Sequence, residues 1–177
     1  MAEQQDPSPP APDAPDTPGE ATPEEIAALT GHAIVAGYGI PGRAVGDLLA
    51  RQHTPFCVIE LNPQTVRRLS RTPHKGVYLI VGDVSQEQTL LRAGIERASL
   101  FAVTVPVDAA VLEAVRIARR LNPGLRILAR CRYVSTALEA ARRGADEVVS
   151  EEQVVAREFA KLLGGEGGEG GEARGEG

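Results

Sequence analysis

Short apolar runs alternate with amphipathic stretches through residues 31–163 of this 177-residue chain. The runs lack the strict apolar–polar alternation of a strand with one wet face, which favours a parallel sheet covered by helices on both faces. They predict six strands, at residues 33–36, 56–59, 77–81, 100–105, 127–131 and 147–149. The intervening stretches predict helices at residues 41–52, 63–70, 85–94, 108–121 and 135–144, with a closing helix at 151–163. Six strands joined by crossover helices indicate an α/β fold, a Rossmann-like doubly wound parallel sheet of strand order 3-2-1-4-5-6.

Residues that favour helix starts precede several of these stretches. Thr22, with Pro23 after it and Glu25 three positions on, predicts a capping box for a short lead-in helix within residues 22–30. Asn62 before a proline is a typical N-cap. The other predicted helix starts are a capping box of Ser85 with Gln88, the N-cap Asp108, and Ser135. These signals support the division into strands and helices.

Charge is distributed unevenly, so the formal net charge of −5 describes no single surface. Residues 1–25 hold seven of the 13 prolines and seven acids but no Lys or Arg, and residues 164–177 hold eight of the 19 glycines, four acids and one arginine. Such compositions cannot bury a core, so we expect disordered tails at residues 1–21 and 164–177. The central residues 26–163 carry 18 bases and 13 acids and contain the one predicted domain, residues 31–163.

Several classes of protein are excluded by composition. No run approaches the ~20 apolar residues of a membrane-spanning helix, and the N-terminus lacks a signal region, so we expect a soluble, cytoplasmic protein. Cys57 and Cys131 lie in apolar runs and are expected to be small core residues. The three histidines show no metal-ligand spacing. An aromatic content of 3% offers no base-stacking platform, and no nucleic-acid-binding motif accompanies the basic centre, so no nucleic-acid partner is expected.

The candidate chemistry begins at a glycine-rich turn. Gly37, Gly39 and Gly42 form a G-x-G-x-x-G motif that follows the first predicted strand and opens a helix. In a dinucleotide-binding turn, the first glycine permits the tight bend, the second lets backbone N–H groups approach a pyrophosphate, and the third lets the helix pack closely. Pro41 suits the first helical turn. An ordinary tight turn is the alternative, and the strand, the helix and an acid at position 60 favour nucleotide binding over it.

Glu60 lies at the end of the second predicted strand, 23 positions after Gly37. Its carboxylate is expected to accept hydrogen bonds from the ribose hydroxyls of adenosine and to repel a 2′-phosphate. Neither Leu61 nor Asn62 is an arginine that could bind such a phosphate. The sequence therefore favours NAD(H), or an adenine nucleotide, over NADP(H).

Other polar residues near predicted strand ends allow two interpretations each. Asp83 follows the third strand and could bond an adenine amino group or form a turn. Arg43, just past the glycine turn, could reach a phosphate or be solvated. Arg130 and Arg132 share one face of the fifth strand, so both must meet solvent or an anion.

Catalytic equipment is not recognisable in the sequence. The three tyrosines are followed four positions later by Gly42, Gly82 and Ala137, so the Tyr-x-x-x-Lys pair of short-chain dehydrogenases is absent. No nucleophile and base are positioned by a motif, and the predicted sheet leaves no room for a substrate domain. We therefore expect a nucleotide sensor and not an enzyme. The alternatives are a small NAD-dependent oxidoreductase with an unrecognised catalytic group and a scaffold with an empty, degenerate site.

A known family shares the order of these motifs. The segments are GHAIVAGYGIPGRAVGDLLA, VIELNPQTVRRL, VGDVSQEQTLLRAGIERAS, ARRLNPGLRILARCRY and RRGADEVVSEE. Residues 31–163 resemble the RCK N-terminal (TrkA-N) domain of potassium channels and transporters, most closely the version found in Kef-type monovalent cation:proton antiporters. The resemblance implies a Rossmann domain that binds NAD(H), or ATP, ADP or AMP, forms a homodimer and regulates a membrane cation channel or cation:proton antiporter.

The resemblance also implies which residues contact the nucleotide. Gly37, Gly39 and Gly42 would form the phosphate turn, Glu60 the ribose acid, and Asp83 with Val84 the adenine contact. The full set of candidate cofactor-binding residues is Gly37, Gly39, Ile40, Pro41, Gly42, Arg43, Glu60, Leu61, Asp83 and Val84.

Three departures from the family pattern refine this expectation. Many relatives carry an arginine at the position of Ile40, where it engages a terminal phosphate, so ATP-specific sensing is disfavoured. Calcium-gated channel relatives carry carboxylates at the positions of Arg130 and Arg132, so a calcium site of that kind is not expected. After Leu163 we expect no second regulatory domain, and we expect no membrane part before the core. The cation path is therefore expected to belong to a separate protein.

Overall fold

A six-stranded parallel sheet in the order β3-β2-β1-β4-β5-β6 forms the centre of the computed structural model, which describes residues 19–71 and 76–164. The strands are β1 (Ala33–Ala36), β2 (Phe56–Glu60), β3 (Val77–Val81), β4 (Leu100–Val103), β5 (Arg126–Cys131) and β6 (Glu147–Ser150). The predicted fold class and strand order are confirmed. The fourth strand ends at Val103, two residues earlier than predicted. The next residue, Thr104, donates its hydroxyl to the Gly37 carbonyl in the loop after β1.

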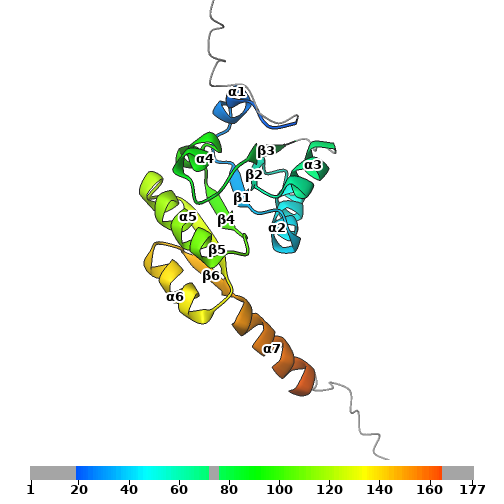
Figure 1. Cartoon of the computed structure of the whole chain (residues 1–177), viewed down its shortest axis with the longest axis vertical. Coiled ribbons are helices and arrows are strands. Elements are labelled where there is room, and N and C mark those ends of the chain that lie inside the picture. Colours follow the sequence, from blue (N-terminus) through cyan, green and yellow to red (C-terminus); the bar gives the residue numbers. More distant parts are fainter. Residues whose placement is uncertain (1–18, 72–75, 165–177) are drawn as a thin grey trace, which may run out of the picture.

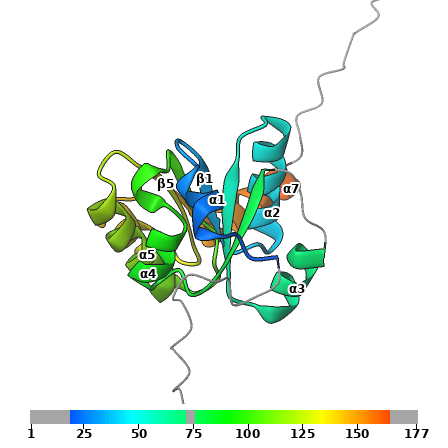
Figure 2. The same cartoon turned by 90° about the horizontal axis from the view of Figure 1, so that it is seen from above.

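Helices cover both faces of this sheet (Figures 1 and 2). The helices are α1 (Pro23–Ala27), α2 (Ile40–Arg51), α3 (Pro63–Arg71), α4 (Glu87–Arg92), the 3-10 helix η1 (Ile95–Arg97), α5 (Asp108–Leu121), α6 (Val134–Arg142) and α7 (Glu151–Gly164). Figure 2 shows α2 and α3 on one side of the sheet and α4 and α5 on the other. Within the described residues, no helix is long and apolar enough to cross a membrane.

The strand pleat divides the apolar residues between two cores. Ala33 and Val35 of β1 pack with Leu49 of α2 on one face. Ile34 and Ala36 of β1 face the larger core, which includes the buried residues of α5. Because β1 is buried on both faces, its four residues are all apolar, as the parallel-sheet prediction requires.

Helix α7 is placed differently from the other helices. It continues directly from β6 and projects away from the sheet (Figure 1). None of its residues is buried. The apolar side chains in its second half, such as Phe159 and Leu162, therefore stay largely exposed within the described chain.

The capping predictions have mixed outcomes. The Thr22–Glu25 capping box is confirmed, and the Asn62 side chain accepts the Gln64 N–H at 2.9 Å. The capping box of Ser85 with Gln88 is wrong, because Gln86 is the N-cap and Ser85 donates to Asp83 instead. The predicted N-cap at Asp108 is wrong: Val107 is the N-cap, and the Asp108 carboxylate accepts the distant Arg132 N–H at 3.0 Å. The helix predicted at Ser135 starts at Val134.

The last three residues of the predicted N-terminal tail, residues 19–21, are packed against β3. Glu20 is only 6% exposed, and the Ala21 N–H donates to the Leu79 carbonyl at 2.8 Å. The prediction of a disordered tail is therefore wrong for these residues. The rest of that tail and residues 165–177 lie outside the described part of the chain.

Both cysteines are buried free thiols, as predicted. Burial raises the pKa of Cys57 to about 12. Burial and the nearby Asp108 carboxylate raise the pKa of Cys131 to about 11. Both side chains therefore stay protonated at neutral pH and serve as apolar core groups.

Candidate functional site

The glycine turn between β1 and α2 has the backbone geometry expected of a phosphate-binding bend. Gly37 adopts a left-handed φ of +82°, and a Cβ on it would lie 3.0 Å from the Val105 side chain. The Gly37 carbonyl accepts the Thr104 hydroxyl at 2.8 Å. Both the torsion and the crowding exclude a side chain here, so the first glycine is required by the fold itself.

The other two glycines of the motif have opposite surroundings. A Cβ on Gly42 would lie 1.9 Å from the Gly37 carbonyl oxygen, so only glycine lets α2 pack this closely on the turn. A Cβ on Gly39 would meet no heavy atom within 4 Å. Gly39 is the N-cap of α2, with no side-chain cap. Open space therefore adjoins the first turn of α2, whose backbone N–H groups an α-helix leaves unpaired and whose dipole favours an anion.

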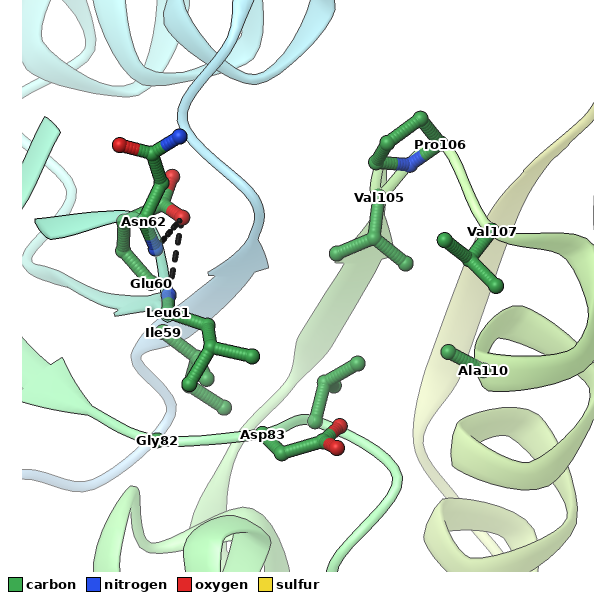
Figure 3. Close-up of a pocket in the computed structure, with 11 residues that line it drawn as sticks. Ile59, Glu60, Leu61, Asn62, Gly82, Asp83, Val105, Pro106, Val107 and Ala110 are labelled. Atoms are coloured by element: carbon green, nitrogen blue, oxygen red, sulfur yellow. Dashed lines mark hydrogen bonds between the residues drawn. The ribbon is translucent and has the colours of Figure 1, made fainter. Parts of the chain in front are cut away.

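The Glu60 carboxylate connects the end of β2 with the glycine turn. Its Oε2 accepts the Tyr38 backbone N–H at 2.9 Å. Its Oε1 accepts the N–H groups of Leu61 and Asn62, each at 2.8 Å (Figure 3). These three backbone N–H groups donate to the negatively charged carboxylate and fix its orientation. Glu60 therefore faces the turn, as its proposed contact with a ribose beside a pyrophosphate demands.

A pocket of about 440 Å³ opens beside Glu60 at the carboxyl edge of the sheet. Figure 3 shows one wall formed by the end of β2 and the opposite wall formed by the segment between β4 and α5. The lining residues are Ile59, Glu60, Leu61 and Asn62 in the first wall, Val105, Pro106, Val107 and Ala110 in the second, and Gly82, Asp83 and Val84 between them. We call Gly82, Asp83 and Val84 the pocket floor. Apolar walls with a few polar groups suit a flat aromatic base, and ligands of open α/β sheets bind at this edge.

Asp83 forms the turn that its sequence position allows, and its side chain also borders the pocket. Its Oδ1 accepts both the N–H and the hydroxyl of Ser85, each at 2.8 Å, which is the hydrogen bonding of a turn-forming Asp. Its side chain also lines the pocket (Figure 3). The turn therefore holds the carboxylate in place without removing it from the pocket.

Not all candidate residues lie in this pocket. Glu60, Leu61, Asp83 and Val84 line it, whereas the three glycines form the adjoining turn. Ile40, which is 77% exposed, and Pro41 line a second cavity of about 570 Å³. Arg43 is exposed on α2 and forms no ion pair with the residues that the structure describes. The candidate set thus divides between the pocket, the turn and a neighbouring surface.

The second wall of the pocket is absent from the sequence-based candidates. Thr104 donates its hydroxyl to the carbonyls of Ala36 and Gly37, at 2.9 and 2.8 Å. Val105, Pro106 and Val107 follow it along the wall. The predicted strand order already places the fourth strand beside the first, so the residues after the fourth strand could have been expected to face the glycine turn.

Arg130 in β5 and Arg132, directly after it, bind that same segment. Arg130 pairs with the Glu151 carboxylate at the start of α7 and donates to the Thr104 carbonyl at 2.9 Å. Arg132 donates to the Pro106 carbonyl at 3.0 Å. The anion that the sequence leads us to expect beside Arg130 is therefore a carboxylate of the chain itself.

Comparison with known proteins agrees with this geometry. A model of the TrkA-N domain family matches residues 33–151. The chain is 33% identical over 132 residues to the inner membrane protein YbaL of Escherichia coli, covering 75% of this chain. The crystal structure of the YbaL TrkA-N domain is similar with a TM-score of 0.70 and 32% identity, covering 77% of this chain and 98% of that domain.

Two further relatives come from a channel and from a Kef protein. Potassium channel protein 1 of Methanocaldococcus jannaschii is 29% identical over 140 residues, or 78% of this chain. The AMP-bound Kef C-terminal domain of Shewanella denitrificans has a TM-score of 0.61 and 27% identity, covering 76% of this chain and 82% of that domain. The chain spans 23% of the length of YbaL and 41% of the length of the potassium channel protein.

Proposed function

Because the chain belongs to the TrkA-N domain family, we propose that it is a regulatory module that binds NAD(H) or an adenine nucleotide and controls potassium or other monovalent cation transport by a separate membrane protein. The observation that carries this proposal is the Glu60 carboxylate, fixed by the Tyr38 N–H beside an open glycine turn and lining the pocket. The AMP in the Kef relative and the channel relative support the nucleotide and the transport role.

Each part of the nucleotide has a proposed place. The first turn of α2, opened by Gly39, would receive the phosphates. The Glu60 Oε2 accepts the Tyr38 N–H, and its second lone pair could accept a ribose hydroxyl. The base would lie over the pocket floor beside Asp83. The negative charge of Glu60 would repel a 2′-phosphate, so NAD(H) is preferred over NADP(H).

The polar side chains of the pocket support a binding role without catalysis. Glu60 accepts three backbone N–H groups, and Asp83 accepts two hydrogen bonds from Ser85. These donors hold both carboxylates in fixed orientations, as contacts with a bound ligand require. We therefore propose a sensor that responds to occupancy, at the cytoplasmic face of its membrane partner.

A homodimer completes this proposal through α7 and the second cavity. The exposed apolar side chains of α7 include Val155 (52% exposed), Phe159 (62%) and Leu162 (72%). The second cavity lies next to this helix and is lined by residues of α2, β4, β5 and the start of α7. A contiguous apolar surface of this kind is typical of a protein interface. We propose that a second copy of the chain covers it, so that both apolar surfaces are buried together.

The oligomeric state tests the dimer directly. Phe159→Asp places a charge on the apolar face of α7 and should shift the protein to a monomer in sedimentation equilibrium. Leu138→Asp, at a side chain that is 57% exposed on α6, a helix that does not line the second cavity, is the matched control and should leave the dimer intact. A wild-type protein that sediments as a monomer at every concentration would overturn the dimer and leave the nucleotide site untouched.

Thermal stability tests the nucleotide site. Purified protein is titrated with NAD⁺, NADH, ATP, ADP, AMP and, as a discriminating ligand, NADP⁺. A ligand at one hundred times its Kd stabilises the folded state by about 2.7 kcal/mol, which raises the melting temperature of a chain of this size by about 5–10 °C. At least one adenine nucleotide should do so, and NADP⁺ should do so least. If no nucleotide shifts the melting temperature of folded protein, the proposal is refuted.

A further inference from the structure

Residues 19–21 lie along the outer edge of β3, the edge strand of the sheet. The Ala21 N–H donates to the Leu79 carbonyl at 2.8 Å. One residue earlier, the Glu20 Oε1 accepts the Val81 N–H at 2.9 Å. These contacts occupy backbone groups that an edge strand otherwise exposes. We call residues 19–21 the N-terminal strap.

Glu20 is buried as a charged group and is paired through its Oε1. Its side chain is 1% exposed and forms an ion pair with Arg92 of α4. Arg92 also donates through Nη1 to the Val81 carbonyl at 3.2 Å. Burying a carboxylate is costly unless an opposite charge and hydrogen bonds compensate it. Arg92 and the Val81 N–H provide this compensation. The Glu20–Arg92 pair thereby holds both the N–H and the carbonyl of Val81.

Val81 is the residue that leads into the pocket floor. The next residue, Gly82, donates its N–H to the Glu60 carbonyl at 3.1 Å on the inner side of the sheet. A Cβ on Gly82 would lie 2.8 Å from the Thr89 hydroxyl, so α4 also packs tightly here. Thr89 and Arg92 are three positions apart and therefore share one face of α4. The end of β3 is thus fixed by Glu60 on one side and by the strap and α4 on the other.

We propose that Glu20 and Arg92 are positioning residues of the nucleotide site: they hold the end of β3 so that Gly82, Asp83 and Val84 form the floor on which the base lies. This inference rests on the proposed nucleotide binding. Glu20 precedes the residues that match the TrkA-N family. The site of this chain is therefore completed by a segment outside the family module.

The test compares Glu20→Ala, Glu20→Gln and Arg92→Ala with a matched control. The control is Glu87→Ala, which removes another carboxylate–arginine pair at the same helix, α4, where Glu87 pairs with Arg120 and both side chains are half-exposed. Two quantities are measured well below the melting temperature of each variant. They are the Kd of the nucleotide that binds the wild type most tightly and the amide hydrogen-exchange rates of residues 82–85.

The expected result follows from the lost contacts. Glu20→Ala leaves the Arg92 guanidinium and the Val81 N–H without their acceptor, which should weaken binding about tenfold and speed exchange of the floor amides by a similar factor. Glu20→Gln keeps an acceptor for Val81 and should give a smaller effect, and Arg92→Ala should resemble Glu20→Ala. Glu87→Ala should change neither quantity.

A lower melting temperature with unchanged Kd and unchanged exchange at residues 82–85 would overturn the proposal, because the pair would then stabilise the fold only. The same conclusion would follow if Glu87→Ala weakened binding as much as Glu20→Ala. If Glu20→Ala fails to fold, Glu20→Gln decides by the same two measurements. If the wild type binds no nucleotide, the proposed function fails, while the exchange rates still decide whether the strap holds the floor.

Discussion

Replacing Gly39 by alanine separates the folding role of the glycine turn from its binding role. Gly39 has φ −71° and ψ −160°, an extended conformation that alanine adopts without strain. An added Cβ would meet no heavy atom within 4 Å. Loss of a glycine from the unfolded chain stabilises by about 0.4–1 kcal/mol, and alanine is a poorer N-cap than glycine by a comparable amount. The free energy of unfolding should therefore change by less than about 1 kcal/mol.

The same methyl group occupies the space through which a phosphate would approach the first turn of α2. Binding of NAD⁺ should weaken at least about tenfold, which is 1.4 kcal/mol. Adenosine carries no phosphate, so its affinity should be unchanged. Gly42→Ala is the contrasting variant, because its methyl would lie 1.9 Å from the Gly37 carbonyl oxygen and force the turn and α2 apart. Such overpacking should cost about 1–3 kcal/mol of stability.

Urea unfolding measures the stabilities, and titration calorimetry measures the affinities for NAD⁺ and adenosine. Gly39→Ala should lose affinity for NAD⁺ but not for adenosine, and it should keep the stability of the wild type. A variant that binds NAD⁺ like the wild type would show that the turn does not contact the phosphates. Equal losses for NAD⁺ and adenosine would show that the methyl group disturbs the whole pocket.

Three other predictions follow from local contacts. Thr104→Val keeps the side-chain shape but removes the hydroxyl bonded to the Ala36 and Gly37 carbonyls, so urea unfolding should show a loss of about 1–2 kcal/mol. The Ile127 N–H, and then Arg119, lower the pKa of Asp146 below 3.8. Its stabilisation is therefore present above pH 3.8 and fades as pH falls through the folded value, so Asp146→Asn should be less stable than wild type at pH 7 and converge with it in acid. Because burial raises the pKa of Cys57 to about 12 and that of Cys131 to about 11, a thiol reagent at pH 8 should label both only at the rate of unfolding, and a bound nucleotide should slow this labelling.

The parts of the fold that the sequence predicts correctly depend on local or repeating signals. Runs such as residues 33–36 are apolar on both faces, and that alone indicates a covered parallel strand. The Thr22 capping box is predicted correctly because its donor and acceptor lie three residues apart. The glycine turn is recognisable for a similar reason, because the tightest contact of Gly42 is with the Gly37 carbonyl oxygen in the same six-residue motif.

The parts that are missed depend on partners far along the chain. Asp108 looks like an N-cap, but the Arg132 N–H, 24 residues away, takes its Oδ1. Glu20 stands in a proline-rich acidic stretch whose composition predicts disorder, yet it bonds Val81 and Arg92, which are 61 and 72 residues away. Composition describes the average of a segment. Whether one acid in that segment is buried depends on whether the fold places a compensating base beside it.

The β4–α5 segment shows why such distant partners matter for function. Val105, Pro106 and Val107 line the pocket beside Glu60, while Thr104 lines the second cavity with Arg130 and Glu151. Arg130 binds both the Thr104 carbonyl and the Glu151 carboxylate at the start of α7. A ligand that displaced this segment would therefore disturb the Arg130 contact to the first residue of α7. Such a displacement would link the pocket to α7, and a sensor needs a shared contact of this kind for occupancy of one site to be felt at another.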